Sequence, residues 1–170
     1  MKTLAVTLLL SFLTTASFAQ NKYAKDVETI DSIIEALYAS ISGEKGEARD
    51  WERFRNLFIA EAKLMPTGVN QQGVAGYRAW GVEEYIPRVD ENFLENGFIE
   101  REISKKIEQF RNVAHVFSTY ESRRTKKGEI IARGINSIQL FYDNERWWVV
   151  SVFWASENTD HPIPEKYLEY

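Results

Sequence analysis

The feature of this chain that most constrains its fold is a run of four long predicted β-strands in its second half. Alternating apolar and polar residues predict strands at 98–109, 113–123, 129–142 and 146–155. Short turns separate them, so consecutive strands must pair antiparallel. Strands in globular proteins usually have about five or six residues. A sheet of such long strands, with helices on one face, can curl and enclose a pocket.

Helical periodicity dominates the first half of the chain. Apolar residues recur at spacings of three and four, and Asp50 is suited to be the N-cap of a helix. Pro87 predicts a kink or a late start in the last helix. The predicted elements are helices at 26–41, 50–58 and 82–94, a short strand at 62–65 and a loop at 66–81. The predicted fold class is therefore α+β, with N-terminal helices packed on a curved antiparallel meander.

The first residues have the pattern of a secretory signal peptide. Lys2 gives a basic start, an apolar run follows, and the small residues Ser17 and Ala19 precede a predicted cleavage site. The apolar run of about ten residues is too short to span a bilayer, which takes about twenty. We expect a signal peptide at 1–19, a single domain at 20–170, a periplasmic or secreted location, and no membrane contact after cleavage.

Composition argues against several classes of function. The formal net charge is −4, and no basic patch is visible, so nucleic acid is not an expected partner. The chain has no cysteine, which removes disulfides, thiol catalysis and thiolate metal sites. Its two histidines, His115 and His161, are far apart, and no run of residues has metal-ligand spacing. We therefore expect no metal site and no cofactor.

The order of elements and three stretches of sequence resemble the NTF2-like superfamily, which includes SnoaL-like and ketosteroid-isomerase-like proteins. The stretches are 30–65, 112–122 (NVAHVFSTYES) and 133–150, which contains RGINSIQL and WWVV. The resemblance implies a cone-shaped barrel that wraps around the first helix, with a pocket on its concave face. It also implies a homodimer through the outer sheet face. This fold hosts enzymes, binding proteins and assembly domains alike.

The resemblance also indicates what is missing for isomerase chemistry. Ketosteroid-isomerase-like enzymes need a carboxylate base at the end of the short strand and a second acid on the third meander strand. This chain has Met65 and Pro66 at the first place and Asn136 to Gln139 at the second. Neither place offers Asp or Glu, so proton transfer of the steroid-isomerase type is disfavoured, and no complete catalytic constellation is visible.

His115 and Tyr38 are the two candidates for catalysis. A histidine can act as a base near neutral pH. On its predicted strand, however, His115 shares a face with Phe117 and Thr119, and a structural hydrogen bond or an outward position is the alternative. Tyr38 lies where isomerase-like members place a pocket tyrosine, whose hydroxyl stabilises an oxyanion. Packing within the apolar stripe of the helix is the alternative role for Tyr38.

Asn136, Tyr120 and Trp80 join those two residues as candidates for ligand binding. Asn136 shares a strand face with apolar residues, so a buried amide there needs a ligand or a neighbouring backbone group as partner. Small residues precede Tyr120 on its face and leave room either for a pocket or for a closely packed helix. Trp80 stands in a glycine-rich loop, where it either covers the pocket or anchors the loop.

Adjacent tryptophans predict a covered outer face. Trp147 and Trp148 are neighbours on one strand, so they point to opposite faces of the sheet. One of them must lie on the convex face, where a bare tryptophan needs a partner or a loop. Together with Trp154 and Phe141, this pattern predicts a homodimer through the outer sheet face.

Three functions follow as hypotheses. The first is an exported protein that binds a small, largely apolar molecule in its pocket. The second is a SnoaL-type isomerase, cyclase or lyase with His115 as base and Tyr38 as hydrogen-bond donor. The third is a dimerising assembly module that uses only its outer face. The position of His115 discriminates between the first two, because a base must face the pocket.

Overall fold

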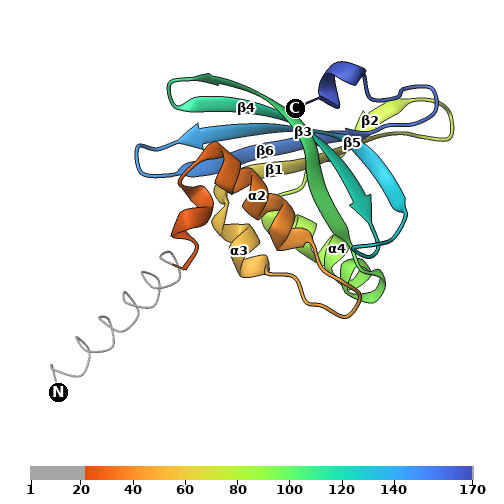
Figure 1. Ribbon diagram of the computed structural model, residues 1–170, viewed down its shortest axis with the longest axis horizontal. Helices are drawn as coiled ribbons and strands as arrows, with labels where there is room; N and C mark the ends of the chain where they lie inside the picture. Colours follow the sequence, from red (N-terminus) through yellow and green to blue (C-terminus); the bar gives the residue numbers. More distant parts are fainter. Residues whose placement is uncertain (1–21, 170) are drawn as a thin grey trace, which may run out of the picture.

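The computed structural model describes residues 22–169, and the predicted signal peptide lies outside them. Helices cover one face of a curved six-stranded sheet (Figure 1). The elements are η1 (Ala24–Val27), α2 (Ile30–Ile41), α3 (Trp51–Asn56), β1 (Phe58–Val69), β2 (Ala75–Tyr77), α4 (Val82–Asn96), β3 (Ile99–Phe110), β4 (Val113–Arg123), β5 (Ile130–Tyr142), β6 (Trp147–Ser156) and η2 (Glu165–Tyr167). The α+β fold class is confirmed.

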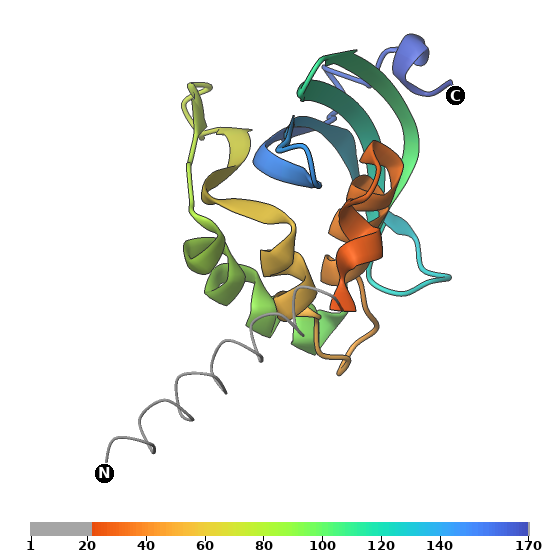
Figure 2. The ribbon, with the colours of Figure 1, turned by 90° about the vertical axis from the view of Figure 1, so that its left-hand side faces the viewer.

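The strand order explains how the sheet encloses space. The order is β2-β1-β6-β5-β4-β3, so the meander from β3 to β6 pairs consecutively and antiparallel. Strand β1 pairs parallel with β6 at the edge of this meander. Strand β2 pairs antiparallel with the end of β1. Seen from the side, the sheet curves around the helices (Figure 2). The predicted meander is confirmed, with strand ends within one or two residues.

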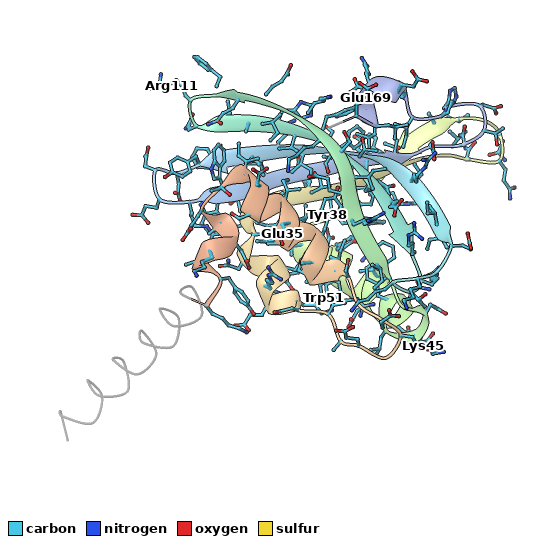
Figure 3. All side chains as sticks on the ribbon, viewed as in Figure 1. Glu35, Tyr38, Lys45, Trp51, Arg111 and Glu169 are labelled. Carbon is cyan, nitrogen blue, oxygen red and sulfur yellow. The ribbon has the colours of Figure 1, made fainter. Side chains whose placement is uncertain are left out.

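Local capping fixes where the helices begin. Thr29 adopts an extended backbone and its hydroxyl accepts from the Ser32 amide, so α2 starts at Ile30 rather than at Asp26 as predicted. The side chain of Asp50 accepts from the Arg53 amide, which confirms the predicted N-cap of α3. In Figure 3, Trp51 marks α3, and Lys45 the loop before it.

Two predictions about the middle of the chain are wrong. The short strand predicted at 62–65 is the twelve-residue β1, and the loop predicted at 66–81 contains β2, which forms a hairpin with the end of β1. The outer half of β1 is exposed, so no burial pattern marks it in the sequence. Backbone pairing with β6, including Met65 beside Phe153 and Pro66 beside Trp154, holds it in the sheet.

A bulge in β3 changes which of its residues face the helices. Ser104 pairs with Thr119, and Glu102 with Tyr120, so one extra residue lies between them on β3. Strict alternation predicts Glu100, Glu102 and Glu108 on one face. The bulge instead turns Glu100 and Glu102 to the concave face, the face of Tyr120, and leaves Glu108 beside His115.

The C-terminal segment covers part of the convex face. Thr119 donates a hydrogen bond to the carbonyl of Tyr167 (2.6 Å), and Ser104 donates one to the carbonyl of Glu169 (2.6 Å). Both hydroxyl residues are fully buried beneath this segment, whose Tyr167 ring also contacts Phe117. Within residues 22–169, no helix is both long and apolar enough to cross a membrane.

Candidate ligand-binding cavity

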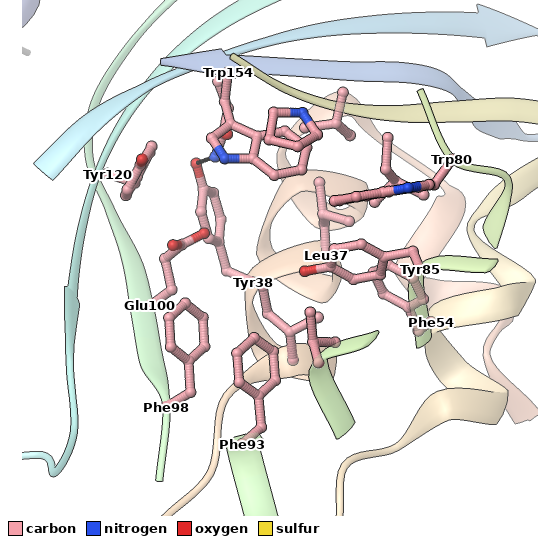
Figure 4. Close-up of a pocket in the computed structure, with 16 residues that line it drawn as sticks. Leu37, Tyr38, Phe54, Trp80, Tyr85, Phe93, Phe98, Glu100, Tyr120 and Trp154 are labelled. Carbon is pink, nitrogen blue, oxygen red and sulfur yellow. Dashed lines mark hydrogen bonds between the residues drawn. The ribbon is translucent and has the colours of Figure 1, made fainter. Parts of the chain in front are cut away.

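A cavity of about 290 Å³ lies between the helices and the concave face of the sheet (Figure 4). Its walls are mainly apolar and aromatic, and include Leu37, Phe54, Leu64, Val89, Phe93, Phe98, Val152 and Trp154. Most of these side chains come from α2, α3, α4, β1 and β6, and Phe98 directly precedes β3. The cavity therefore forms where the core packing between the helices and the curved sheet is incomplete.

A chain of hydrogen bonds crosses one wall of the cavity. Ser118 on β4 and Asn136 on β5 are direct cross-strand neighbours, and both face Tyr38 on α2. The Asn136 Nδ2 group donates to the Tyr38 hydroxyl (3.0 Å), which lies 2.7 Å from the Ser118 Oγ atom. Ser118 in turn donates to an Oε atom of Glu102 (2.5 Å), whose carboxylate is paired with Lys105 (2.8 Å).

Glu100 places a carboxyl group at the cavity. Its backbone is fixed by Ser42, whose hydroxyl donates to the Glu100 carbonyl (3.0 Å) and accepts from the Glu100 amide (2.9 Å). In Figure 4 the carboxyl group points toward Tyr38. Burial raises the pKa of Glu100 to about 8, although the nearby Asn136 amide favours the ionised form.

Tyr85 and Tyr120 add two hydroxyl groups. The Tyr85 hydroxyl points into the cavity and makes no hydrogen bond to the described residues (Figure 4); burial raises its pKa. The Tyr120 hydroxyl bonds to the Ser156 Oγ atom (3.0 Å), and burial raises its pKa to about 12. The Tyr120 ring lies directly over Gly134, where a Cβ atom would stand 2.6 Å from the Tyr120 hydroxyl oxygen.

Four of the five predicted site residues line this one cavity. Tyr38, Tyr120, Asn136 and Trp80 all border it, although they come from different elements. Burial raises the pKa of Tyr38 above its ordinary value, with the nearby Glu100 and Glu102 charges acting in the same direction. Their role in ligand binding stays a prediction.

The structure places His115 on the opposite face of the sheet. Its ring contacts Phe117 and its Nε2 atom lies 3.0 Å from the Ser137 hydroxyl, both on the convex side. Alternation along β4 turns Ala114 and Val116 inward and therefore His115 outward. His115 does not border the cavity, so the hypothesis that it is the catalytic base has no geometric support.

The paired tryptophans separate as predicted, but Trp154 does not join them outside. Trp147 is buried, and Trp148 lies on the convex face, where it donates to Asp143 (2.6 Å) beneath the Arg146 guanidinium. Trp154 lines the cavity, because β6 has its own bulge near Val150. The prediction that Trp154 contributes to the outer face is therefore wrong.

Sequence reasoning missed Glu100, Tyr85 and the connection to Glu102. Tyr85 lies in the predicted helix at 82–94, but the spacing of apolar residues does not indicate that its hydroxyl points into a cavity. The two glutamates are misassigned by the bulge described above. Across residues 22–169, no group of three or more His, Cys, Asp or Glu side chains is arranged to hold a metal ion.

Comparison with known proteins gives structural matches alone. No family model and no curated protein matches the chain. A function-unknown protein from Mycobacterium tuberculosis matches with a TM-score of 0.60 and 14% identity, over 79% of this chain and 75% of that one. A protein of unknown function with a cystatin-like fold from Nostoc punctiforme matches with a TM-score of 0.57 and 14% identity, over 78% and 96%.

A third match bears the name of the fold itself. An NTF2-like protein of unknown function from Silicibacter pomeroyi matches with a TM-score of 0.50 and 12% identity, over 75% of this chain and 92% of that one. Identities this low carry information about the backbone and not about the activity. The helices, the meander and the parallel β1 together show that this chain has the NTF2-like fold.

Proposed function

We propose that this protein binds a small, largely apolar molecule in the cavity, with the polar end of the molecule beside Glu100, Asn136 and Tyr85. The observation that carries the proposal is a preformed cavity with aromatic walls and a few polar atoms gathered at one side. An apolar ligand body would replace water on the aromatic walls, and its polar group would meet the unpaired hydroxyl of Tyr85.

Binding can be tested with the protein's own tryptophans. Trp80 and Trp154 line the cavity, so a ligand that enters it changes their emission. We expect the bicyclic alcohol 1-tetralol to change the fluorescence saturably. The variant Val152→Phe fills the cavity from β6 and should weaken binding about tenfold or more.

A matched control separates blockage from damage to the sheet. Ile135→Phe adds a phenyl ring on the opposite face of the neighbouring strand and should leave binding unchanged. Equal loss of binding in both variants, or no saturable change in the wild type, would contradict the proposal. Native mass spectrometry of protein purified from its own host would then identify the natural ligand class.

A second function has support from Glu100. A carboxyl group with a raised pKa beside a bound molecule can exchange protons with it, as in isomerase- or lyase-type reactions. In this second hypothesis Glu100, and not His115, is the group that transfers the proton. The test is deuterium exchange at the carbon next to the carbonyl of 1-tetralone in D₂O. Exchange above the buffer rate that Glu100→Gln abolishes would support it, and equal rates would refute it.

We also propose a homodimer through the convex face of β5 and β6. Phe153 there is 41% exposed, and Phe141 lies on the same face. The C-terminal segment covers the neighbouring β3 and β4, so the free part of this face is narrower than the resemblance implies. Light scattering should show a dimer that becomes a folded monomer in Phe153→Ser, whereas a monomeric wild type would contradict it.

Export remains a separate proposal that rests on residues 1–19. The basic start, apolar run and small residues before the cleavage site support it. Cell fractionation followed by N-terminal sequencing should find a chain that begins at Gln20 outside the cytoplasm. A full-length chain in the cytoplasm would contradict it.

A further inference from the structure

In the hydrogen-bond chain of the cavity wall, each group donates toward Glu102. Glu102, the member farthest from the cavity, determines this direction of donation. Glu102 lies away from the cavity, where its carboxylate is paired with Lys105, which also contacts Asp31 (2.7 Å). An ionised carboxylate accepts hydrogen bonds and donates none. The hydrogen on Ser118, 2.5 Å away, must therefore point to Glu102.

The direction passes inward one group at a time. A serine hydroxyl has a single hydrogen, so Ser118 can only accept from the Tyr38 hydroxyl. The Tyr38 hydrogen is then used, and its oxygen must accept from the Nδ2 group of Asn136. The nitrogen and oxygen of an asparagine amide are distinguished by such a network. Glu102 thus fixes the orientation of an amide two hydroxyl groups away.

The fixed orientation leaves the Asn136 oxygen available. This Oδ1 atom makes no hydrogen bond to residues 22–169. In the same part of the chain, the only fully enclosed side-chain nitrogen or oxygen without a partner is Nδ2 of Asn56. The Asn136 oxygen is therefore accessible, and Asn136 lines the cavity. The same chain prevents the Tyr38 hydroxyl from donating to a ligand, because its hydrogen points to Ser118.

We propose that Glu102 acts as a positioning residue for ligand specificity. Through Ser118 and Tyr38 it presents the Asn136 oxygen as an acceptor, so that the cavity prefers molecules whose polar group carries a donor hydrogen, such as an alcohol, phenol or amine N–H. This inference rests on the proposed function and narrows the class of ligand. A carbonyl-only ligand would face an acceptor oxygen and gain nothing from Asn136.

Two probes of nearly equal shape test the preference. 1-Tetralol carries a hydroxyl group and 1-tetralone a carbonyl group on the same ring frame. We expect the wild type to bind the alcohol about tenfold more tightly than the ketone, the ratio that one well-placed hydrogen bond provides. Competition between them, followed by tryptophan fluorescence, gives the ratio of the two dissociation constants.

Glu102→Gln changes the direction without removing the chain. A glutamine amide can donate to Ser118, after which Ser118 donates to Tyr38 and Tyr38 to the Asn136 oxygen. The amide of Asn136 then turns its Nδ2 group to the cavity, and we expect the preference for the alcohol to fall to about twofold or to reverse. Ser118→Ala cuts the chain and should have the same effect. Glu108→Gln makes the same charge change at an exposed position of β3 and should keep the tenfold preference.

The amide orientation can also be measured without a ligand. In wild-type protein, nuclear Overhauser contacts should join the Asn136 amino protons to the Tyr38 ring, and Glu102→Gln should weaken them. If these contacts are absent from the wild type, or persist unchanged in Glu102→Gln with an unchanged probe ratio, the inference is wrong. If neither probe binds the wild type, the proposed function fails, while the contacts still decide the orientation.

Discussion

The two faces of β4 and β5 carry similar polar side chains in very different surroundings. On the concave face, Ser118 and Asn136 are buried and joined to Tyr38 in one chain of hydrogen bonds. On the convex face, His115 and Ser137 form a single bond in a half-buried position. A buried polar group must have a partner, so the concave groups determine one another's orientation, whereas the convex pair remains independent.

The largest expected difference between the faces is in packing. Ile138 and Ile135 lie on the same strand, the first fully buried on the concave face and the second half-buried on the convex face. Ile138→Ala should lower the free energy of unfolding by about 3–4 kcal/mol, and Ile135→Ala by about 1 kcal/mol. Urea denaturation measures both. Equal losses would show that the convex face is as tightly packed as the cavity side.

The next effect is a pH dependence that comes from Glu100 on the concave face. The folded protein holds the Glu100 proton up to about pH 8, whereas the unfolded chain releases it near pH 4.5. The folded state therefore binds more protons between these values, and stability falls as the pH rises through this window. The loss should be on the order of 2 kcal/mol, reduced from the full shift because the cavity admits water.

Glu100→Gln isolates this contribution. The amide has no proton to release, so the variant should match the wild type near pH 5 and exceed its stability above pH 8. Denaturation midpoints at pH 5, 7 and 9 measure the difference. A wild-type curve that stays parallel to the variant at all three values would show that the Glu100 carboxyl is ordinarily solvated.

A smaller effect concerns ligand affinity. Asn136→Ala removes the proposed acceptor in the cavity and should weaken 1-tetralol binding about tenfold. His115→Ala changes the other face of the neighbouring strand and should leave the affinity within about twofold. Fluorescence titration measures the dissociation constant of 1-tetralol for both variants. A large loss of affinity in His115→Ala would contradict the assignment of ligand binding to the concave face alone.

The smallest effect tests the one place where the convex face resembles the concave one. Thr119 is buried beneath the C-terminal segment and donates to the Tyr167 carbonyl. Thr119→Val keeps the shape but removes the hydroxyl, and should lower the free energy of unfolding by about 1 kcal/mol. Thr119→Ser keeps the hydrogen bond and serves as the control. No change in Thr119→Val would mean that water replaces the segment there.

Much of the fold could be predicted because it depends on periodic burial. The strands of the meander alternate over long runs, and Asp50 carries an explicit helix-start signal, so both were predictable. The outer half of β1 and the short β2 are held by backbone pairing, while their side chains face solvent. Alternation in a sequence reflects the burial of side chains. The outer half of β1 and the strand β2 therefore could not be predicted from it.

The candidate site was only partly predictable for a related reason. Tyr120 and Asn136 stand on regular stretches of strand, so alternation predicted which neighbours on the strand share a face with each of them. Glu100 precedes the bulge between Glu102 and Ser104, and a single extra residue reverses the face assigned to everything before it. Strict alternation therefore groups Glu100 and Glu102 with Glu108, although the bulge places Glu108 on the other face of the sheet. No proline or glycine in β3 indicates a bulge at this position in the sequence.

Gly134 has a consequence for the evolution of this cavity. A glycine codon becomes an alanine codon by one nucleotide substitution, and the added methyl group would meet the Tyr120 ring and the carbonyl of Ala155. Because that Cβ atom would stand far inside van der Waals distance of the Ala155 carbonyl oxygen, the backbone of β6 would have to shift as well as the Tyr120 ring. A single nucleotide substitution at a position outside the cavity would thus displace Tyr120, a residue of its wall, without replacing any residue that lines it.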